Sequence, residues 1–171
     1  MATRDRDAVD HIVEQWAAVR PDLDSSPIGI IGRVSRLSRL VDRRLAENFA
    51  RFGLENWMYD VLATLRRGGA PFELTAGDLV RRTMVTTGAI TNRIDRLEER
   101  GLVERRAAAD DRRKVIVRMT ADGLRLVDEV AGAHMATEDE ILGALTDRQR
   151  IQLANLLRVP LLTLGDDALV Y

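Results

Sequence analysis

The chain from Leu79 to Thr120 reads LVRRTMVTTGAITNRIDRLEERGLVERRAAADDRRKVIVRMT. Apolar residues recur at helical spacing after Met84, which predicts a helix that ends at Gly101. Two runs of β type, 102–105 and 115–119, follow and are joined by an Arg-rich turn. A short helix over 76–82, capped by Thr75, precedes them. Helix, tight turn, helix, strand, turn and strand in this order predict a winged helix-turn-helix, a fold that binds duplex DNA.

The second helix of this motif begins with small polar side chains. Such an N-terminus suits a position close to phosphates and base edges in a major groove. Ile90, Ile94 and Leu97 form the face that is expected to pack inward. The predicted DNA-binding residues lie on the opposite face and at the wing tip: Thr86, Thr87, Thr91, Asn92, Arg93, Arg96, Arg112, Arg113 and Lys114.

Charge is distributed unevenly along the chain. The formal net charge of the whole chain is −1, but residues 81–118 contain eleven basic and six acidic residues and carry +5, which leaves −6 for the remainder. A basic module on an acidic body is the electrostatic signature of a DNA-binding protein. The alternative is an ordinary solvated face rich in Arg. It does not explain why the charge coincides with the helix order and the wing.

Composition excludes several other classes of protein. The 171 residues are 46% hydrophobic and 31% charged, as in globular chains, and contain no Cys, so disulfides and thiolate zinc sites are excluded. His11 and His134 lack the partners of a metal site and are expected to be ordinary helix residues. There is no catalytic triad, paired-carboxylate arrangement or Gly-rich phosphate loop, so no enzyme and no cofactor is predicted. Without a membrane-length apolar run or a signal peptide, the expected location is cytoplasmic.

Amphipathic helices are expected on both sides of the motif. They cover 4–19, 28–52 and 54–67 before it, and about 120–145 and 146–164 after it. Pro160 is expected to kink or end the last helix near Arg158. The predicted fold class is therefore mainly α with a small β-wing (α+β). N-terminal helices occupy 1–53, the winged helix-turn-helix 54–120 and C-terminal helices 121–171.

The terminal helices carry more apolar residues than one small domain can cover. We therefore expect them to be dimerisation helices that pack against a second copy, giving a homodimer. The second helix of each motif, here called the reading helix, would lie about one DNA turn from its counterpart, so that the pair matches a palindromic operator. A monomer whose terminal helices fold back on the winged core is the alternative.

The order of the elements resembles that of the MarR family of bacterial transcription regulators. Asp111-Arg112-Arg113, followed by Val117-Arg118-Met119-Thr120, resembles that family's wing signature, D-x-R with a trailing L-T. The resemblance covers nearly the whole chain. It implies a dimer formed through the terminal helices, a reading helix in the major groove and Arg113 at the wing tip, where a narrow minor groove attracts Arg.

A narrower resemblance is to the urate-responsive (PecS/HucR-like) branch of this family. The stretches WMYDVLATLRR from Trp57 and GAITNRI from Gly88 carry it. It implies a ligand set of Trp16, on an extra N-terminal helix, with Asp60, Arg93 and Arg105. Urate is a planar aromatic anion, which an Arg fork can pair with and a Trp face can stack on. A ligand that draws Arg93 inward would move the reading helix and lower DNA affinity.

Each member of the ligand set has a plainer interpretation. Trp16 would pack the extra helix on the core, Asp60 would be a helix-surface carboxylate, and Arg93 and Arg105 would contact phosphates only. Three functions remain open: a repressor released by urate or a related purine, a regulator of the same fold with another ligand or none, and a winged-helix module for protein interaction.

Overall fold

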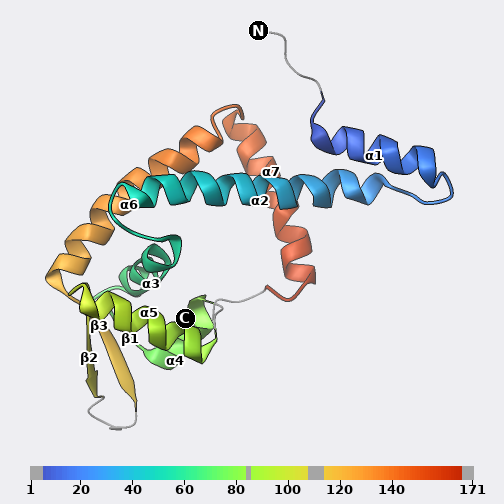
Figure 1. Ribbon diagram of the computed structural model, residues 1–171. Coiled ribbons are helices and arrows are strands. Elements are labelled where there is room, and N and C mark those ends of the chain that lie inside the picture. The colour runs from blue at the N-terminus through green and yellow to red at the C-terminus, as the bar shows by residue number, and fades with distance from the viewer. Residues whose placement is uncertain (1–5, 84–85, 108–113, 167–171) are drawn as a thin grey trace. The chain divides into compact units, whose positions relative to one another are not determined.

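A computed structural model describes residues 6–83, 86–107 and 114–166 (Figure 1). The chain divides into two compact units, with the division between Arg44 and Leu45 inside the long helix α2, Ser26–Ala50. Mainly helical structure with one small antiparallel sheet confirms the predicted fold class. The domain boundaries at 53 and 120 stay a prediction.

The first unit contains α1, Ala8–Val19, and the part of α2 up to Arg44. Asp7 caps α1 by accepting from the backbone of Val9 and Asp10, and the Asp10 side chain accepts from the backbone of Asp7 in return. This reciprocal cap satisfies amide donors that the helix leaves free. Val9 is buried, and its methyl groups lie where a side chain at Gly32 would project. Absence of a side chain at that position thus lets α1 approach α2 closely.

The second unit contains the winged helix-turn-helix. In chain order it is built from α3 (Asn56–Arg67), β1 (Glu73–Thr75), α4 (Ala76–Thr83), α5 (Thr87–Glu99), β2 (Val103–Ala107) and β3 (Val115–Met119). One apolar cluster joins these elements, and Leu62, Leu79, Ile90 and Val117 are fully buried in it. The predicted helices and the two predicted strands are confirmed.

The sheet has three strands in the order β1-β3-β2, all antiparallel. Glu73 faces Arg118 across β1 and β3, and Glu104 faces Arg118 across β2 and β3. Sequence reasoning missed β1, because three residues ahead of a helix cap show no alternation of their own. Its pairing with β3 anchors the base of the wing beside α4.

Gly101 makes the turn from the reading helix into the wing. Its φ of +68° lies in the left-handed region that favours glycine. This geometry lets the Leu102 amide donate to the Leu97 carbonyl at 3.0 Å and places Leu102 in the core. The helix stop predicted at Gly101 is confirmed, and it sets where the wing begins relative to α5.

Two helices complete the second unit: α6, Ala121–Ile141, and α7, Asp147–Thr163. Val127 and Val130 of α6 are buried in the common core, whereas no residue of α7 is buried. The alternative that α7 ends near Arg158 is wrong, because the helix continues through Pro160 to Thr163. Proline removes one amide donor near the end of the helix, and the Leu164 amide still donates to the Pro160 carbonyl at 3.0 Å.

The junction of wing and α6 predicts a pair of glycine substitutions with opposite outcomes. A Cβ on Gly123 would lie 2.1 Å from the Leu102 carbonyl oxygen, whereas a Cβ on Gly132 of the same helix would meet no atom within 4 Å. Gly123→Ala should therefore lower stability by about 2 kcal/mol or more, as overpacked sites do. Gly132→Ala should leave stability unchanged or raise it by about 0.5–1 kcal/mol. Thermal or urea unfolding measures both, and equal effects would contradict the described junction.

Candidate nucleic-acid interface and effector site

Helix α5 divides into a buried face and a solvent-exposed face. Ile90, Ile94 and Leu97 are at most 1% exposed and pack into the core, as predicted. The Thr86 side chain caps the helix by accepting from the Ala89 amide at 3.3 Å. The polar residues at the start of α5 that are open to solvent are Thr86, Thr87, Thr91 and Asn92. This end of the helix therefore exposes hydroxyl and amide groups to solvent, as DNA reading requires.

Arg93 and Arg96 lie on the side of α5 that faces α3. Both guanidinium groups lie over the Trp57 ring, with their carbons 5.8 Å and 4.8 Å from its centroid. Such cation–π contacts restrain long side chains that would otherwise be free. Arg96 also donates to a Glu55 carboxylate oxygen, and the Trp57 indole N–H donates to the other oxygen at 2.8 Å.

Asp60 on α3 forms an ion pair with Arg93, with 3.9 Å between Oδ2 and Nη1. Its side chain is half-buried, and this desolvation raises the pKa of the Asp60 carboxyl above 3.8. The positive charges of Arg93 and Arg67 lower that pKa but do not cancel the effect of burial. Asp60 thus links α3 to the reading helix with a carboxylate whose charge is incompletely compensated.

Arg105 on β2 is bound to a different side of α5. Its guanidinium donates to Asp95 and to Glu98, each at 2.5 Å, and to the Thr91 carbonyl at 3.3 Å. These three acceptors recur along one side of the helix, whereas Arg93 comes two residues after Thr91, roughly 200° around the axis. Arg105 therefore ties the wing to α5 from the side opposite to Asp60.

The structure thus brings together two of the four predicted ligand residues, Asp60 and Arg93. Arg105 is held by other acids, and Trp16 lies in the first unit, where it is 45% exposed. Of the wing residues, Lys114 is exposed just before β3, and Arg112 and Arg113 lie outside the described residues. The assignment of the DNA and ligand residues stays a prediction.

Glu55 and Trp57 were missed as functional candidates. Trp57 is partly buried against the core, and its ring also supports both arginines. Glu55 stands just ahead of α3 without capping it through its side chain. Nothing local to the sequence shows that residues about forty positions apart meet, so only the packing of α3 on α5 reveals this cluster.

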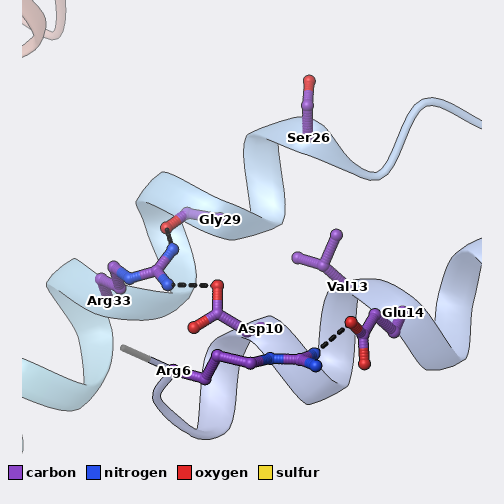
Figure 2. A pocket seen from close by; sticks show the side chains of 7 residues that line it. All are labelled: Arg6, Asp10, Val13, Glu14, Ser26, Gly29 and Arg33. Atoms are coloured by element: carbon purple, nitrogen blue, oxygen red, sulfur yellow. Dashed lines mark hydrogen bonds and ion pairs between the residues drawn. The ribbon is translucent and has the colours of Figure 1, made fainter. Parts of the chain in front are cut away.

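A hollow of about 310 Å³ lies within the first unit, between α1 and α2 (Figure 2). Its charged side chains satisfy one another, because Arg6 pairs with Glu14 and Arg33 donates to Asp10 at 2.7 Å. None of the predicted ligand residues lines it. These ion pairs therefore hold α1 on α2, and the charged groups that line the hollow are already paired, so none of them is available to select a ligand.

Metal and membrane sites find no support in the described part of the chain. There, no group of three or more His, Asp or Glu side chains is arranged to hold a metal ion. No helix within the same residues is long and apolar enough to cross a membrane.

The fold and the exposed polar start of α5 together define a winged-helix DNA-binding protein. A sequence model of the MarR family matches residues 52–114. The HTH-type transcriptional regulator PecS of Dickeya dadantii (strain 3937) is 38% identical over 149 residues, which cover 87% of this chain and 90% of PecS. The chain therefore belongs to the MarR family of DNA-binding transcriptional regulators and is not an enzyme, as predicted.

Solved structures show the same fold. Sco3205 of Streptomyces coelicolor, a MarR family regulator determined in complex with DNA, has the same fold, with a TM-score of 0.76 at 20% identity over 84% of this chain and 90% of that chain. BpsR of Bordetella bronchiseptica has a TM-score of 0.69 at 25% identity over 81% of this chain and 94% of that chain. Its structure concerns regulation of DNA binding by 6-hydroxynicotinic acid.

The raised pKa of Asp60 predicts a distinctive pH dependence. The folded state binds the Asp60 proton more tightly than the unfolded chain does, so the stability that this proton contributes is present at low pH and lost as pH rises through the folded pKa. Asp60→Asn should therefore raise the melting temperature relative to the parent at pH 7, and this advantage should shrink by pH 4.

Asp78→Asn serves as a control of opposite sign. Hydrogen bonding to Thr75 lowers the pKa of Asp78, so its stabilisation is present at neutral pH and lost on acidification. That variant should melt below the parent at pH 7, and the gap should narrow by pH 4. Circular dichroism at both pH values measures the two variants, and parallel trends would contradict the assigned shifts.

Proposed function

We propose that this regulator is a homodimeric repressor that binds a palindromic operator and is released by urate or a closely related planar anion. The observation that carries the proposal is the Asp60–Arg93 ion pair, which joins α3 to the reading helix. An anionic ligand that takes Arg93 from Asp60 acts directly on the element that reads DNA.

The DNA-binding part of the proposal rests on α5 and on the charge of the motif. Thr87, Thr91 and Asn92 are exposed at the start of the helix, where a hydroxyl or an amide can reach base edges. Residues 81–118 carry +5, so the module attracts the phosphate backbone despite the acidic remainder of the chain. Arg112, Arg113 and Lys114 of the wing are proposed to add contacts in the neighbouring minor groove.

The effector part rests on competition between two anions for one guanidinium. Burial already raises the pKa of the Asp60 carboxyl, so its ionised form is poorly stabilised where it stands. Urate beside Arg93 would add negative charge and displace Asp60 from the pair. Arg93 would follow the ligand and turn α5, and the spacing of the two reading helices in a dimer would change.

Two relatives support this class of effector. PecS, whose branch the sequence resembles, is 38% identical over 149 residues, which cover 87% of this chain. DNA binding by BpsR is regulated by 6-hydroxynicotinic acid, which is also a planar aromatic acid. Of the other two residues that the resemblance assigns to the ligand, Arg105 binds Asp95 and Glu98 on the side of α5 opposite to Asp60, and Trp16 belongs to the first unit, so the proposed site is centred on Asp60 and Arg93.

The decisive experiment titrates urate into a preformed complex of the protein with its own promoter DNA. Urate should release the DNA and raise the melting temperature of the free protein, because a ligand that binds only the folded state stabilises it. Asp60→Asn should form the complex but show at least about tenfold weaker coupling between urate and DNA, the equivalent of about 1.4 kcal/mol, because no Asp60–Arg93 pair remains for urate to break. Arg93→Ala should weaken both activities.

Asp128→Asn is the matched control for this titration. Asp128 also pairs with an arginine, Arg66 of α3, at 2.7 Å, but this pair does not involve α5. The control should respond to urate like the parent. Release that is unchanged in Asp60→Asn, or DNA binding that is indifferent to millimolar urate, would contradict the urate proposal.

A second candidate is a regulator of the same fold with a different planar acid as its effector. The likeness to BpsR favours it, since that protein's DNA binding responds to a hydroxylated pyridine carboxylic acid. The same titration with 6-hydroxynicotinic acid distinguishes the two. If this acid releases the DNA and urate does not, the proposed exchange at Asp60–Arg93 stands and the proposed effector is replaced.

The dimer is proposed from the apolar surface of α7. Exposed fractions of 63–70% at Ile151, Leu156 and Val159 are unusual for such residues and mark a surface that another chain covers. Contact with a second copy would bury them and set the separation of the two reading helices.

Leu156→Asp tests this surface. Because Leu156 is 70% exposed in one protomer, the substitution should not unfold a monomer, but it should dissociate the dimer by burying a charge at its interface. Sedimentation should show monomers, and operator affinity should fall at least about tenfold when two half-sites are no longer read together. Arg148→Asp, in the first turn of α7, is the control: it changes the net charge by two units, against one for Leu156→Asp, and should leave the dimer intact. If Leu156→Asp remains dimeric, this interface is excluded.

A further inference from the structure

Glu55 and Arg96 form the contact from which a further inference can be drawn. Arg96 lies on α5 in the predicted DNA-binding set, and its side chain is 46% exposed. The guanidinium is nevertheless held by two contacts within the protein: a Glu55 carboxylate oxygen accepts from it, and its carbon lies 4.8 Å from the centroid of the Trp57 ring. A phosphate approaching α5 therefore meets an arginine that already holds an anion.

The Glu55 carboxylate is itself fixed in place. One oxygen accepts from the Trp57 indole N–H at 2.8 Å, which leaves the other oxygen directed to Arg96. Hydrogen bonds from Trp57 and Arg96 lower the pKa of Glu55, so the carboxylate is ionised throughout the physiological pH range. The competing anion is thus permanently charged and correctly oriented.

We propose that Glu55 is an internal competitor of DNA. In the free protein its carboxylate binds Arg96 as a DNA phosphate would, and this pairing sets the affinity of the winged helix-turn-helix for duplex DNA. The inference rests on the proposed placement of Arg96 at the DNA. Binding exchanges one anion for another at this guanidinium, while the Trp57 face remains as its support. Part of the attraction between Arg96 and DNA is consequently used to break the existing pair.

Such a competitor prevents the basic winged helix-turn-helix from binding every DNA duplex tightly. A free arginine contributes through counterion release, with about 0.9 added to the salt slope for each phosphate neutralised. An arginine that leaves a carboxylate contributes less, because the carboxylate must regain a counterion. Removing the charge of Glu55 should therefore strengthen binding to operator and to unrelated duplex alike, and make both more sensitive to salt.

Glu55→Gln tests this directly, with binding measured on operator and on unrelated duplex DNA between about 0.05 and 0.3 M salt. At 0.15 M the affinity should rise about fivefold on both, and the salt slope should steepen by about one, as for one added phosphate contact. Glu129→Gln on the exposed surface of α6 has the same charge change and should have little effect.

A double-mutant cycle assigns the effect to Arg96. Arg96→Ala alone should weaken DNA binding, and Glu55→Gln in that background should no longer strengthen it, since nothing is left to release. Thermal melting of each variant checks that the fold is retained, and Glu55→Asp should behave more like the parent than Glu55→Gln does.

Three results would overturn the proposal. Weaker DNA binding by Glu55→Gln would mean that Glu55 orients Arg96 for DNA instead of competing with it. An equal gain with Arg96→Ala present, or with Glu129→Gln, would reduce the effect to overall charge. If Arg96→Ala leaves DNA binding unchanged while the parent still binds its operator, Arg96 is not at the DNA, and the competition is excluded without affecting the assignment of the family.

Discussion

Burial of one side of α5 is the constraint on which the candidate site depends. Ile90, Ile94 and Leu97 are inserted into a core shared by α3, α4, α6 and the sheet, and each is at most 1% exposed. This fixes the rotation of the helix about its axis, since any other rotation would expose three large apolar side chains, at about 1.5–3 kcal/mol each. The polar residues at the start of α5 are outward-facing for this reason.

Ion pairs then hold the two flanks of α5. On the α3 side, Asp60 and Glu55 engage Arg93 and Arg96 around the Trp57 ring. On the wing side, Arg105 engages Asp95 and Glu98. Half-exposed pairs of this kind contribute little to stability by themselves. Their importance is positional: they are exchangeable links between the reading helix and its two neighbours.

This arrangement gives one physical basis for two proposed behaviours. Each arginine of α5 that could meet an anion from outside is already paired with an internal carboxylate. An effector competes at Arg93 and DNA competes at Arg96, three residues apart on the same side of the same helix. The two proposals differ in their partner and in their test, so either one can fail while the other stands.

Sequence alone determined the element order, the inward face of α5, the stop at Gly101 and the family, because each depends on local periodicity, on cap chemistry or on motif spacing. Residues such as Asp60 and Arg93 were predicted as a set through a resemblance. Only the tertiary structure decided that these two meet, that Arg105 binds the other side of α5, that β1 joins the sheet and that α7 continues past Pro160. The Glu55–Trp57–Arg96 cluster likewise appears only when α3 packs on α5. Partners distant in the chain are chosen by packing, and no local pattern records which side chains two packed helices bring face to face.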